Sequence, residues 1–222
     1  MIFNHVTPPK LKELNTETLH GKRYYVTPEG KKYPSVTTVT GFLSAKEIQA
    51  WRKRIGEDEA NRITRQATTR GTAVHKICES YINNVDEYTK NHMPVNVEAF
   101  SRLKPILDEH INNIVMQECP LYSDYLEVGG RVDCIAEWDG VLSVIDFKTS
   151  RKAKKKEWVK NYFMQESAYC VMFEERTKIP IRQIVTVVYV DNDDSQIFIE
   201  DRDNYIWGFI DLRKQFKSFY DS

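Results

Sequence analysis

The sequence lacks an excess of charge of either sign, a long apolar run and closely spaced cysteines. Its 32 basic residues balance 32 acidic residues, so no overall field attracts a polyanion, and any such contact must come from local patches. No apolar run approaches the roughly 18 residues of a membrane span, so we expect no membrane association. The cysteines show no CxxC spacing and therefore predict no zinc site; they are Cys78, Cys119, Cys134 and Cys170.

Most of these cysteines fall in segments with helix or core-strand patterns, so we expect buried, reduced thiols and a cytoplasmic location. No signal peptide or transit segment is recognised, in agreement with that location. A length of 222 residues, with 41% hydrophobic and 29% charged residues, is typical of one globular domain. We expect three sections in it: an N-terminal hairpin segment, a helical section and a core of sheet and helices, at 1–44, 45–117 and 118–222.

Local patterns predict the order of helices and strands. A turn at Pro28-Glu29-Gly30 separates two short β-rich runs. Helical patterns cover 45–83, with breaks near Gly56 and Gly71, and 98–117, where Pro105 would kink the helix. The remaining predicted elements are a hairpin, a helix at 158–175, strands at 184–190 and 196–200, and a helix at 203–220. This order predicts an α/β fold with a central mixed sheet flanked by helices.

Two β-rich runs flank Asp139-Gly140, a dipeptide that favours a two-residue hairpin turn. In that register Asp133 lies across from Asp146, and Lys148 joins the same face opposite Arg131. Two carboxylates so close repel each other unless a cation lies between them, and Mg²⁺ prefers such oxygen ligands. The pattern therefore indicates metal-assisted attack on a phosphodiester. The alternative is a half-buried hairpin that carries surface charges.

Four motifs occur in the order expected of one family. They are Arg70-Gly71-Thr72-Ala73-Val74-His75, Gly129-Gly130-Arg131-Val132-Asp133, Ile145-Asp146-Phe147-Lys148-Thr149-Ser150 and Gln165-Glu166-Ser167-Ala168-Tyr169. Together they resemble the core of the PD-(D/E)XK nucleases, in the RecB-like exonuclease branch. The resemblance covers residues 70–169 and implies a restriction-endonuclease-like core.

The resemblance also implies roles for individual residues. Catalysis would depend on Asp133, Asp146 and Lys148. One or two Mg²⁺ or Mn²⁺ ions would be bound by His75, Asp133, Asp146 and the Phe147 carbonyl. Gln165 and Tyr169 would line the cleft. Some relatives in this branch hold an iron–sulfur cluster through closely spaced cysteines, which this chain lacks, so we expect no such cluster.

Other residues are candidates with an ordinary alternative. Ser35 and Thr37, in Pro34-Ser35-Val36-Thr37, resemble a segment that borders the DNA path in relatives, but would also suit a helix N-cap. The basic residues expected to contact nucleic acid could instead belong to solvated faces; they are Arg70, Arg131, Lys152, Lys154 and Lys155. Glu79 is a candidate to orient His75 through the second ring nitrogen, and Glu118 is a candidate metal neighbour.

These observations predict a metal-dependent DNA exonuclease that acts on single-stranded DNA from an end, in replication, recombination or repair. The absence of a Walker motif means that any unwinding would need a partner such as a helicase. The alternatives are a structure-specific endonuclease on the same core and a DNA-binding module without catalysis. The size of the chain would suit a bacterial enzyme or one from a phage-infected cell.

Overall fold

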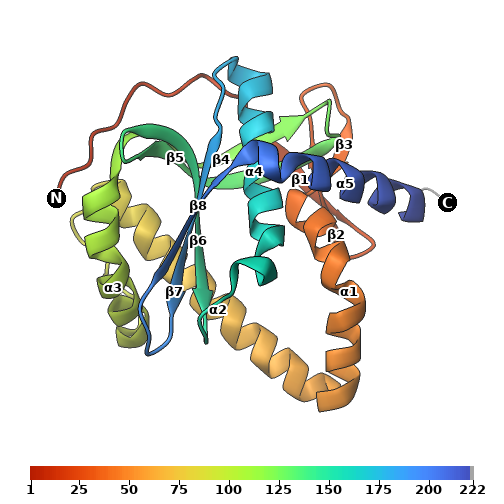
Figure 1. Ribbon diagram of the computed structural model, residues 1–222, viewed down its shortest axis with the longest axis horizontal. Coiled ribbons are helices and arrows are strands. Elements are labelled where there is room, and N and C mark those ends of the chain that lie inside the picture. Colours follow the sequence, from red (N-terminus) through yellow and green to blue (C-terminus); the bar gives the residue numbers. More distant parts are fainter. Residues whose placement is uncertain (221–222) are drawn as a thin grey trace.

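A five-stranded sheet forms the centre of the computed structural model, which describes residues 1–220 (Figure 1). Its strands lie in chain order: β4 (Ile111–Ser123), β5 (Val128–Trp138), β6 (Val141–Ser150), β7 (Gln183–Val190) and β8 (Gln196–Asp201). Only the β6–β7 pair is parallel, and the other neighbours are antiparallel. The sheet is therefore mixed, as the sequence predicted.

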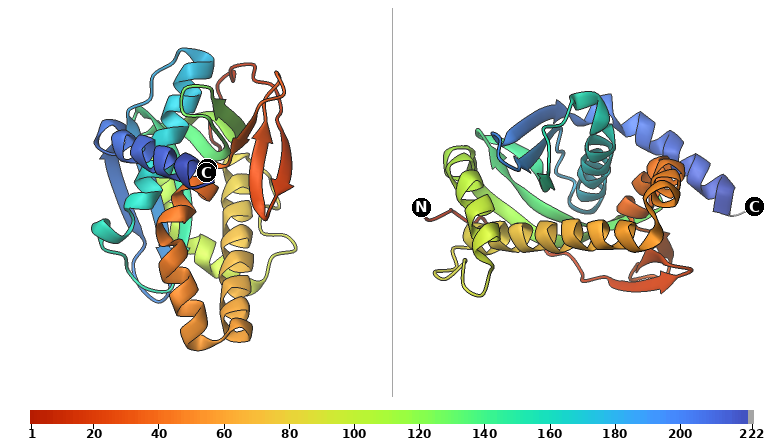
Figure 2. Two further views of the ribbon diagram at one scale, coloured as in Figure 1. Left: turned by 90° about the vertical axis from the view of Figure 1, so that its right-hand side faces the viewer. Right: turned by 90° about the horizontal axis from the view of Figure 1, so that it is seen from below.

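Helices cover both faces of this sheet. On one face lie α2 (Glu57–Ile82) and α3 (Pro94–His110), and on the other lie α1 (Val36–Ile55), α4 (Lys160–Thr177) and α5 (Ile206–Tyr220). Figure 2 shows α2 running beneath the sheet while α4 lies above it. Each face has its own apolar cluster, one around Phe100 and Trp138 and the other around Phe163 and Phe209. The α/β prediction is confirmed, with three layers and two cores.

A second, smaller sheet contains β1 (Asn15–Leu19), β2 (Lys22–Val26) and β3 (Lys32–Pro34). The predicted turn between β2 and β3 is confirmed, whereas β1 lies in a segment for which we predicted no structure. Directly after β3, the Ser35 side chain accepts a hydrogen bond from the Thr38 amide at 3.0 Å and caps α1. The small sheet therefore sets where α1 begins, at Val36 rather than at Ala45.

The predicted helical section, 45–117, is wrong at its C-terminal end. Helix α3 ends at His110, and residues 111–117 belong to β4. Ile111, Asn112, Met116 and Gln117 pair with β5, with a register shift between Asn112 and Met116. The break at Gly56 is confirmed, since this residue has φ 90° between α1 and α2. The break at Gly71 is wrong, because α2 continues through it. Glycine costs about 1 kcal/mol in a helix, which the packing of a 26-residue helix on the sheet outweighs.

The C-terminal third follows the prediction closely. Strands β7 and β8 are present, and α5 follows a 3₁₀ turn at Arg202–Asn204. Another 3₁₀ turn, Lys156–Trp158, precedes α4, so the helix begins two residues later than Trp158. All four cysteines are buried and free, as expected. Within residues 1–220, no helix combines the length and the apolar character needed to cross a membrane.

Candidate active site

The β5–β6 hairpin carries the two predicted catalytic aspartates. Its turn residues Asp139 and Gly140 have φ of 52° and 79°, the left-handed conformation that a two-residue hairpin turn requires. The predicted register is confirmed from Trp138 opposite Val141 to Cys134 opposite Ile145. Trp138, Cys134 and Ile145 are fully buried, so burial holds the hairpin in register, while Val141 beside the turn is exposed.

The pairing stops one step short of the aspartates, which corrects the prediction. Asp133 and Asp146 do not form a cross-strand pair; the Asp133 carboxylate instead accepts a hydrogen bond from the Phe147 amide at 3.1 Å. Arg131 and Lys148 lie beyond the paired part of the β5–β6 hairpin, so the predicted Arg131–Lys148 pair is not formed either; Arg131 pairs with Pro120 of β4 instead. The strands separate at this point, and the Asp133 side chain takes the place of the next backbone contact.

Asp146 is the most enclosed member of the site, with 2% of its surface exposed. The Gln165 amide on α4 donates a hydrogen bond to its Oδ1 at 3.0 Å. The Lys148 ammonium forms an ion pair with its Oδ2 and also lies 5.3 Å from the centre of the Tyr162 ring. The resemblance implied that Gln165 lines the cleft, and in the structure its amide lies on the aspartate that holds Lys148.

His75 approaches from α2, on the other side of the same carboxylates. Its Nε2 lies 3.0 Å from Asp133 Oδ2 and 3.3 Å from Glu118 Oε1. Glu118 has φ 47° in the middle of β4, a strained conformation for a residue with a side chain. Such strain is typical of functional positions, and here it accompanies the approach of the carboxylate to His75.

Glu79 lies one helical turn beyond His75. Ligand atoms of His75, Glu79 and Glu118 lie within 4.8 Å of one another. Glu79 forms an ion pair with Lys76 at 2.8 Å, and within residues 1–220 it has no hydrogen bond to His75. The prediction that Glu79 orients His75 therefore receives no support from a direct contact. Glu79 instead adds a further carboxylate beside the ring.

The pKa values of the site diverge because these groups share a partly buried space. Burial lowers the pKa of His75, but the hydrogen bond and charge of Asp133 outweigh it and raise the value to about 9. Burial raises the pKa of Asp146 to about 6, even beside Lys148. Burial raises the pKa of Asp133, but the hydrogen bond and the charge of His75 outweigh burial and hold this pKa below its usual range. Burial also raises the pKa of Glu118.

Sequence reasoning missed Glu166. This side chain is fully buried, and the Thr186 hydroxyl donates a hydrogen bond to one of its oxygens, while the other oxygen has no partner within residues 1–220. Burial, and next the charge of Asp146, raise the pKa of Glu166 well above its usual range. The neighbours of Glu166 on α4 are buried all around the helix. A single acidic residue among them was the sequence signal that could have identified Glu166.

Tyr169 contributes a close approach between α4 and β5. A Cβ atom on Gly130 would lie 2.6 Å from Cε1 of the Tyr169 ring, so only glycine fits there. Tyr169 is 2% exposed, and burial raises the pKa of its hydroxyl. The Gly129-Gly130 pair is thus explained by packing against aromatic rings, since Gly129 meets Tyr25 in the same way.

The donor set suits a hard divalent cation. One imidazole and the carboxylates of Glu118, Asp133 and Asp146 converge, and burial, with the charge of Asp133 adding to it, raises the pKa of Asp146. Within residues 1–220, Asp146 Oδ2 is buried beside a single positive partner, Lys148, while the neighbouring carboxylates of Asp133 and Glu118 share only His75, so the group carries more acidic than basic side chains. Carboxylate oxygens with one imidazole match the preferences of Mg²⁺ and Mn²⁺.

The residues predicted to contact nucleic acid differ in their surroundings. Ser35 is 2% exposed and caps α1, with Thr37 beside it in the first turn. Arg70 forms an ion pair with Asp191 and lies over the Tyr189 ring at 5.4 Å. Arg131 is exposed and donates to the Glu118 carbonyl oxygen. Lys152, Lys154 and Lys155 lie on the connection from β6 to the 3₁₀ turn, where Lys152 and Lys155 are exposed and Lys154 is half-buried.

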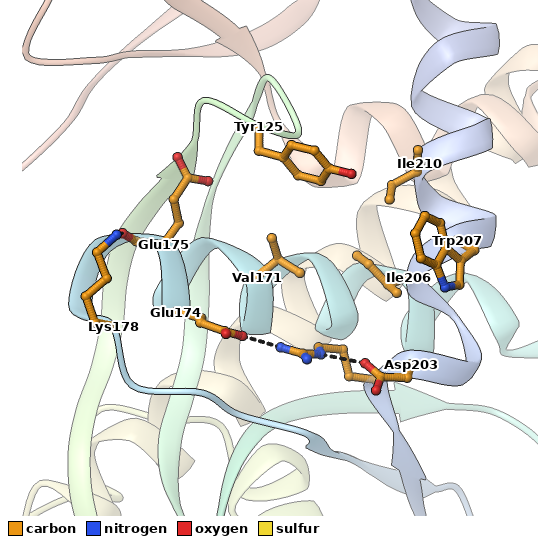
Figure 3. Close-up of a pocket in the computed structure, with 10 residues that line it drawn as sticks. Tyr125, Val171, Glu174, Glu175, Lys178, Asp203, Ile206, Trp207 and Ile210 are labelled. Atoms are coloured by element: carbon orange, nitrogen blue, oxygen red, sulfur yellow. Dashed lines mark hydrogen bonds and ion pairs between the residues drawn. The ribbon is translucent and has the colours of Figure 1, made fainter.

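A cavity of about 680 Å³ lies elsewhere, between α4 and α5 (Figure 3). Tyr125, Val171 and Trp207 line it, and Arg202 crosses its floor between Glu174 and Asp203. None of the predicted site residues line it. The converging carboxylates, rather than this cavity, mark the chemical centre.

Known proteins are similar to part of this chain. Mitochondrial genome maintenance exonuclease 1 of Mus musculus is 30% identical over 129 residues, which cover 54% of this chain and 38% of that protein. The Homo sapiens protein of the same name is 26% identical over 129 residues, with the same coverage. The match thus spans little more than a third of these curated relatives. A crystal structure of a candidate exonuclease from Eubacterium rectale has a TM-score of 0.48 and 11% identity, over 66% of this chain and 64% of that one.

The family profile of the PD-(D/E)XK nuclease superfamily matches residues 42–198. This segment contains His75, Glu118, both aspartates and Lys148, together with all five strands of the central sheet except the end of β8. The chain belongs to the PD-(D/E)XK nuclease superfamily.

Proposed function

We propose that this protein is a divalent-metal-dependent exonuclease that hydrolyses phosphodiester bonds of single-stranded DNA from an end. The observation that carries the proposal is the convergence of His75, Glu118 and Asp133 beside an Asp146–Lys148 ion pair. The names of the curated relatives support the exonuclease assignment. Residues 1–222 would act as one nuclease domain in DNA replication, recombination or repair, in the cytoplasm, with DNA as partner.

Each residue has a role in this proposal. His75, Glu118, Asp133 and Asp146 would hold the Mg²⁺ or Mn²⁺ ion, with the Phe147 carbonyl as a further ligand. When bound, the ion would supply Lewis-acid stabilisation of the phosphoryl oxygens. Lys148 would position the attacking water and stabilise the negative charge that develops on the phosphate. Asp146 orients Lys148, and Gln165 orients Asp146 through its 3.0 Å hydrogen bond.

The preference for an end of a single strand is the finer part of the proposal. Helices α1 and α2 meet at a corner at Gly56 that extends beyond the sheet (Figure 1). Basic side chains Arg52, Lys53 and Arg54 lie in the last turn of α1. A corner of two helices beyond the edge of the sheet would admit a flexible single strand more readily than a stiff duplex. This arrangement favours threading of a free end.

The test is a nuclease assay with Mg²⁺ or Mn²⁺ on three substrates of one sequence. We expect cleavage of end-labelled linear single-stranded DNA and much slower cleavage of circular single-stranded DNA and blunt duplex. The position of the label then gives the polarity. Cleavage of circles at the rate of linear strands would contradict the end requirement and support the endonuclease alternative. Binding without any cleavage would support a module without catalysis.

Metal binding has a separate test that does not depend on activity. Adding Mn²⁺ at about a hundred times its Kd is expected to stabilise the folded protein by about 2.7 kcal/mol, visible as a higher Tm. Asp133→Asn should reduce this shift, because it removes one negative charge from the converging donors. Asp211→Asn is the matched control, since Asp211 is exposed on α5. An undiminished Tm shift in Asp133→Asn would contradict the proposed ligand set.

A further inference from the structure

Trp158 is a large aromatic residue left exposed beside the site. It ends the 3₁₀ turn Lys156–Trp158, and 64% of its surface is exposed. Lys155 Nζ lies 5.4 Å from the centre of its ring. The segment therefore combines a bare aromatic face with the basic run that continues from the strand of Lys148. Exposed aromatic rings among basic side chains are the feature by which proteins bind single-stranded nucleic acid.

The ring of Trp158 borders a cavity of about 280 Å³. Across it lies α1, which contributes Leu43, itself 51% exposed. The other lining groups are polar: Thr40, Ser44, Glu47, Glu157, Lys160 and Asn161. Two apolar side chains from different elements thus line one space, and the groups around them include both hydrogen-bond donors and acceptors. Such a space suits a planar, polar-edged base better than a phosphate.

This cavity is connected to the catalytic residues through the start of α4. Tyr162, four residues after Trp158, is half-buried, and its ring lies 5.3 Å from Lys148 Nζ. The 3₁₀ turn thus carries Trp158 immediately before α4, and α4 then carries Tyr162 beside the catalytic lysine and Gln165 on Asp146. A strand whose phosphate lies at Lys148 could extend along α4 toward Trp158.

We propose that Trp158 and Leu43 form a base-binding subsite that holds an unpaired nucleotide of single-stranded DNA next to the scissile phosphate. This proposal rests on the proposed function and specifies how that site recognises a single strand. Stacking on Trp158 requires an unpaired base with a free face, which a duplex does not present. Lys155 and Lys160 contact the adjoining phosphates. The carboxylates of Glu47 and Glu157 face base edges rather than phosphates, which they would repel.

The experiment measures binding of a fluorescein-labelled single-stranded oligonucleotide by anisotropy, in EDTA, so that no cleavage occurs. Trp158→Ala is expected to weaken binding by roughly 5- to 140-fold, the range for one lost base–aromatic stack. Trp158→Phe keeps an aromatic face and should bind within about threefold of the wild type. Trp207→Ala is the matched control: Trp207 is 68% exposed, but it lines the cavity between α4 and α5. It should bind like the wild type.

Binding of the oligonucleotide should also quench tryptophan fluorescence in the wild type, and the quenching should be lost in Trp158→Phe. Equal affinity of Trp158→Ala and the wild type would overturn the subsite. The subsite would also be overturned if Trp158→Ala lost as much affinity for blunt duplex as for the single strand. The outcomes separate the two proposals. Trp158-dependent binding without cleavage in Mg²⁺ would contradict the proposed function alone, whereas cleavage with Trp158-independent binding would contradict the subsite alone.

Discussion

Replacing Lys148 with alanine is expected to reduce the rate of DNA cleavage by roughly 10²- to 10⁴-fold while the protein stays folded. Lys148 is the cation paired with Asp146, and the charges of Asp146 and Asp133 raise its pKa against the effect of burial. It is therefore charged over the whole working range of pH. Its loss removes the positive charge that would act on the phosphate, but leaves Asp146 hydrogen-bonded to Gln165.

The fold should survive because Asp146 can take up a proton. Its pKa is already about 6, and without Lys148 burial would raise it further, so the variant would hold an uncharged acid. The measurements are single-turnover cleavage with Mn²⁺ and the circular dichroism spectrum. Lys214→Ala, the same change on an exposed face of α5, should cleave normally. Near-normal cleavage by Lys148→Ala would refute the proposed mechanism.

The largest expected loss of stability comes from Phe163→Ala, about 3–5 kcal/mol in the free energy of unfolding. Phe163 is fully buried on α4 and packs edge-on against Phe198 of β8, at 5.8 Å, and against Tyr205, at 4.9 Å. Alanine would leave a cavity between α4 and the sheet that the surrounding rings cannot fill. Equilibrium unfolding in urea measures the change.

Phe163→Leu is the matched variant, because it keeps most of the apolar volume and should cost clearly less. Activity gives a second measurement, since α4 also carries Gln165 and Tyr169. At a temperature where Phe163→Ala is fully folded, we expect reduced cleavage from less precise placement of Gln165. A loss of stability no larger for alanine than for leucine would show that Phe163 is not part of the packed core.

The hairpin could be predicted from the sequence because its determinants are local. Asp139-Gly140 specifies the turn, and the turn fixes which residues face each other up to Cys134 and Ile145. Beyond them the prediction failed, because the separation of β5 and β6 depends on the Asp133 side chain and on the pairing of β6 with β7. Neither is visible in the hairpin sequence.

Strand β4 shows the limit of periodicity. Ile111, Ile114 and Val115 have helical spacing after α3, yet they lie in a strand. Ile111 pairs with Trp138 of β5, and the backbone of Ile114 bonds to Asn4 and Val6 near the N-terminus. These partners are distant in sequence and decide the outcome over local pattern. The same reason explains β1, a polar segment of Asn15–Leu19 that becomes a strand only through pairing with β2.

Some of the site residues could be predicted from the sequence, and others could not. The residues of the four motifs could be predicted by resemblance, and the structure brings His75, Asp133, Asp146, Lys148 and Gln165 together. The contact of Glu118 with His75 depends on a left-handed residue within β4, which no sequence pattern announced. Glu166 was hidden because an acid on a helix usually faces solvent, and its burial follows from sheet and helices enclosing α4.

The site residues come from many different elements, so the site can assemble only when these elements have packed together. His75 comes from α2, Glu118 from β4, Asp133 from β5, Lys148 from β6 and Gln165 from α4. Contacts between segments so distant in the chain form late and slowly. A newly made or partly unfolded chain therefore lacks the assembled site, even where the hairpin sequence is present. Local opening of α2 would remove His75 from this group of residues, and local opening of α4 would remove Gln165.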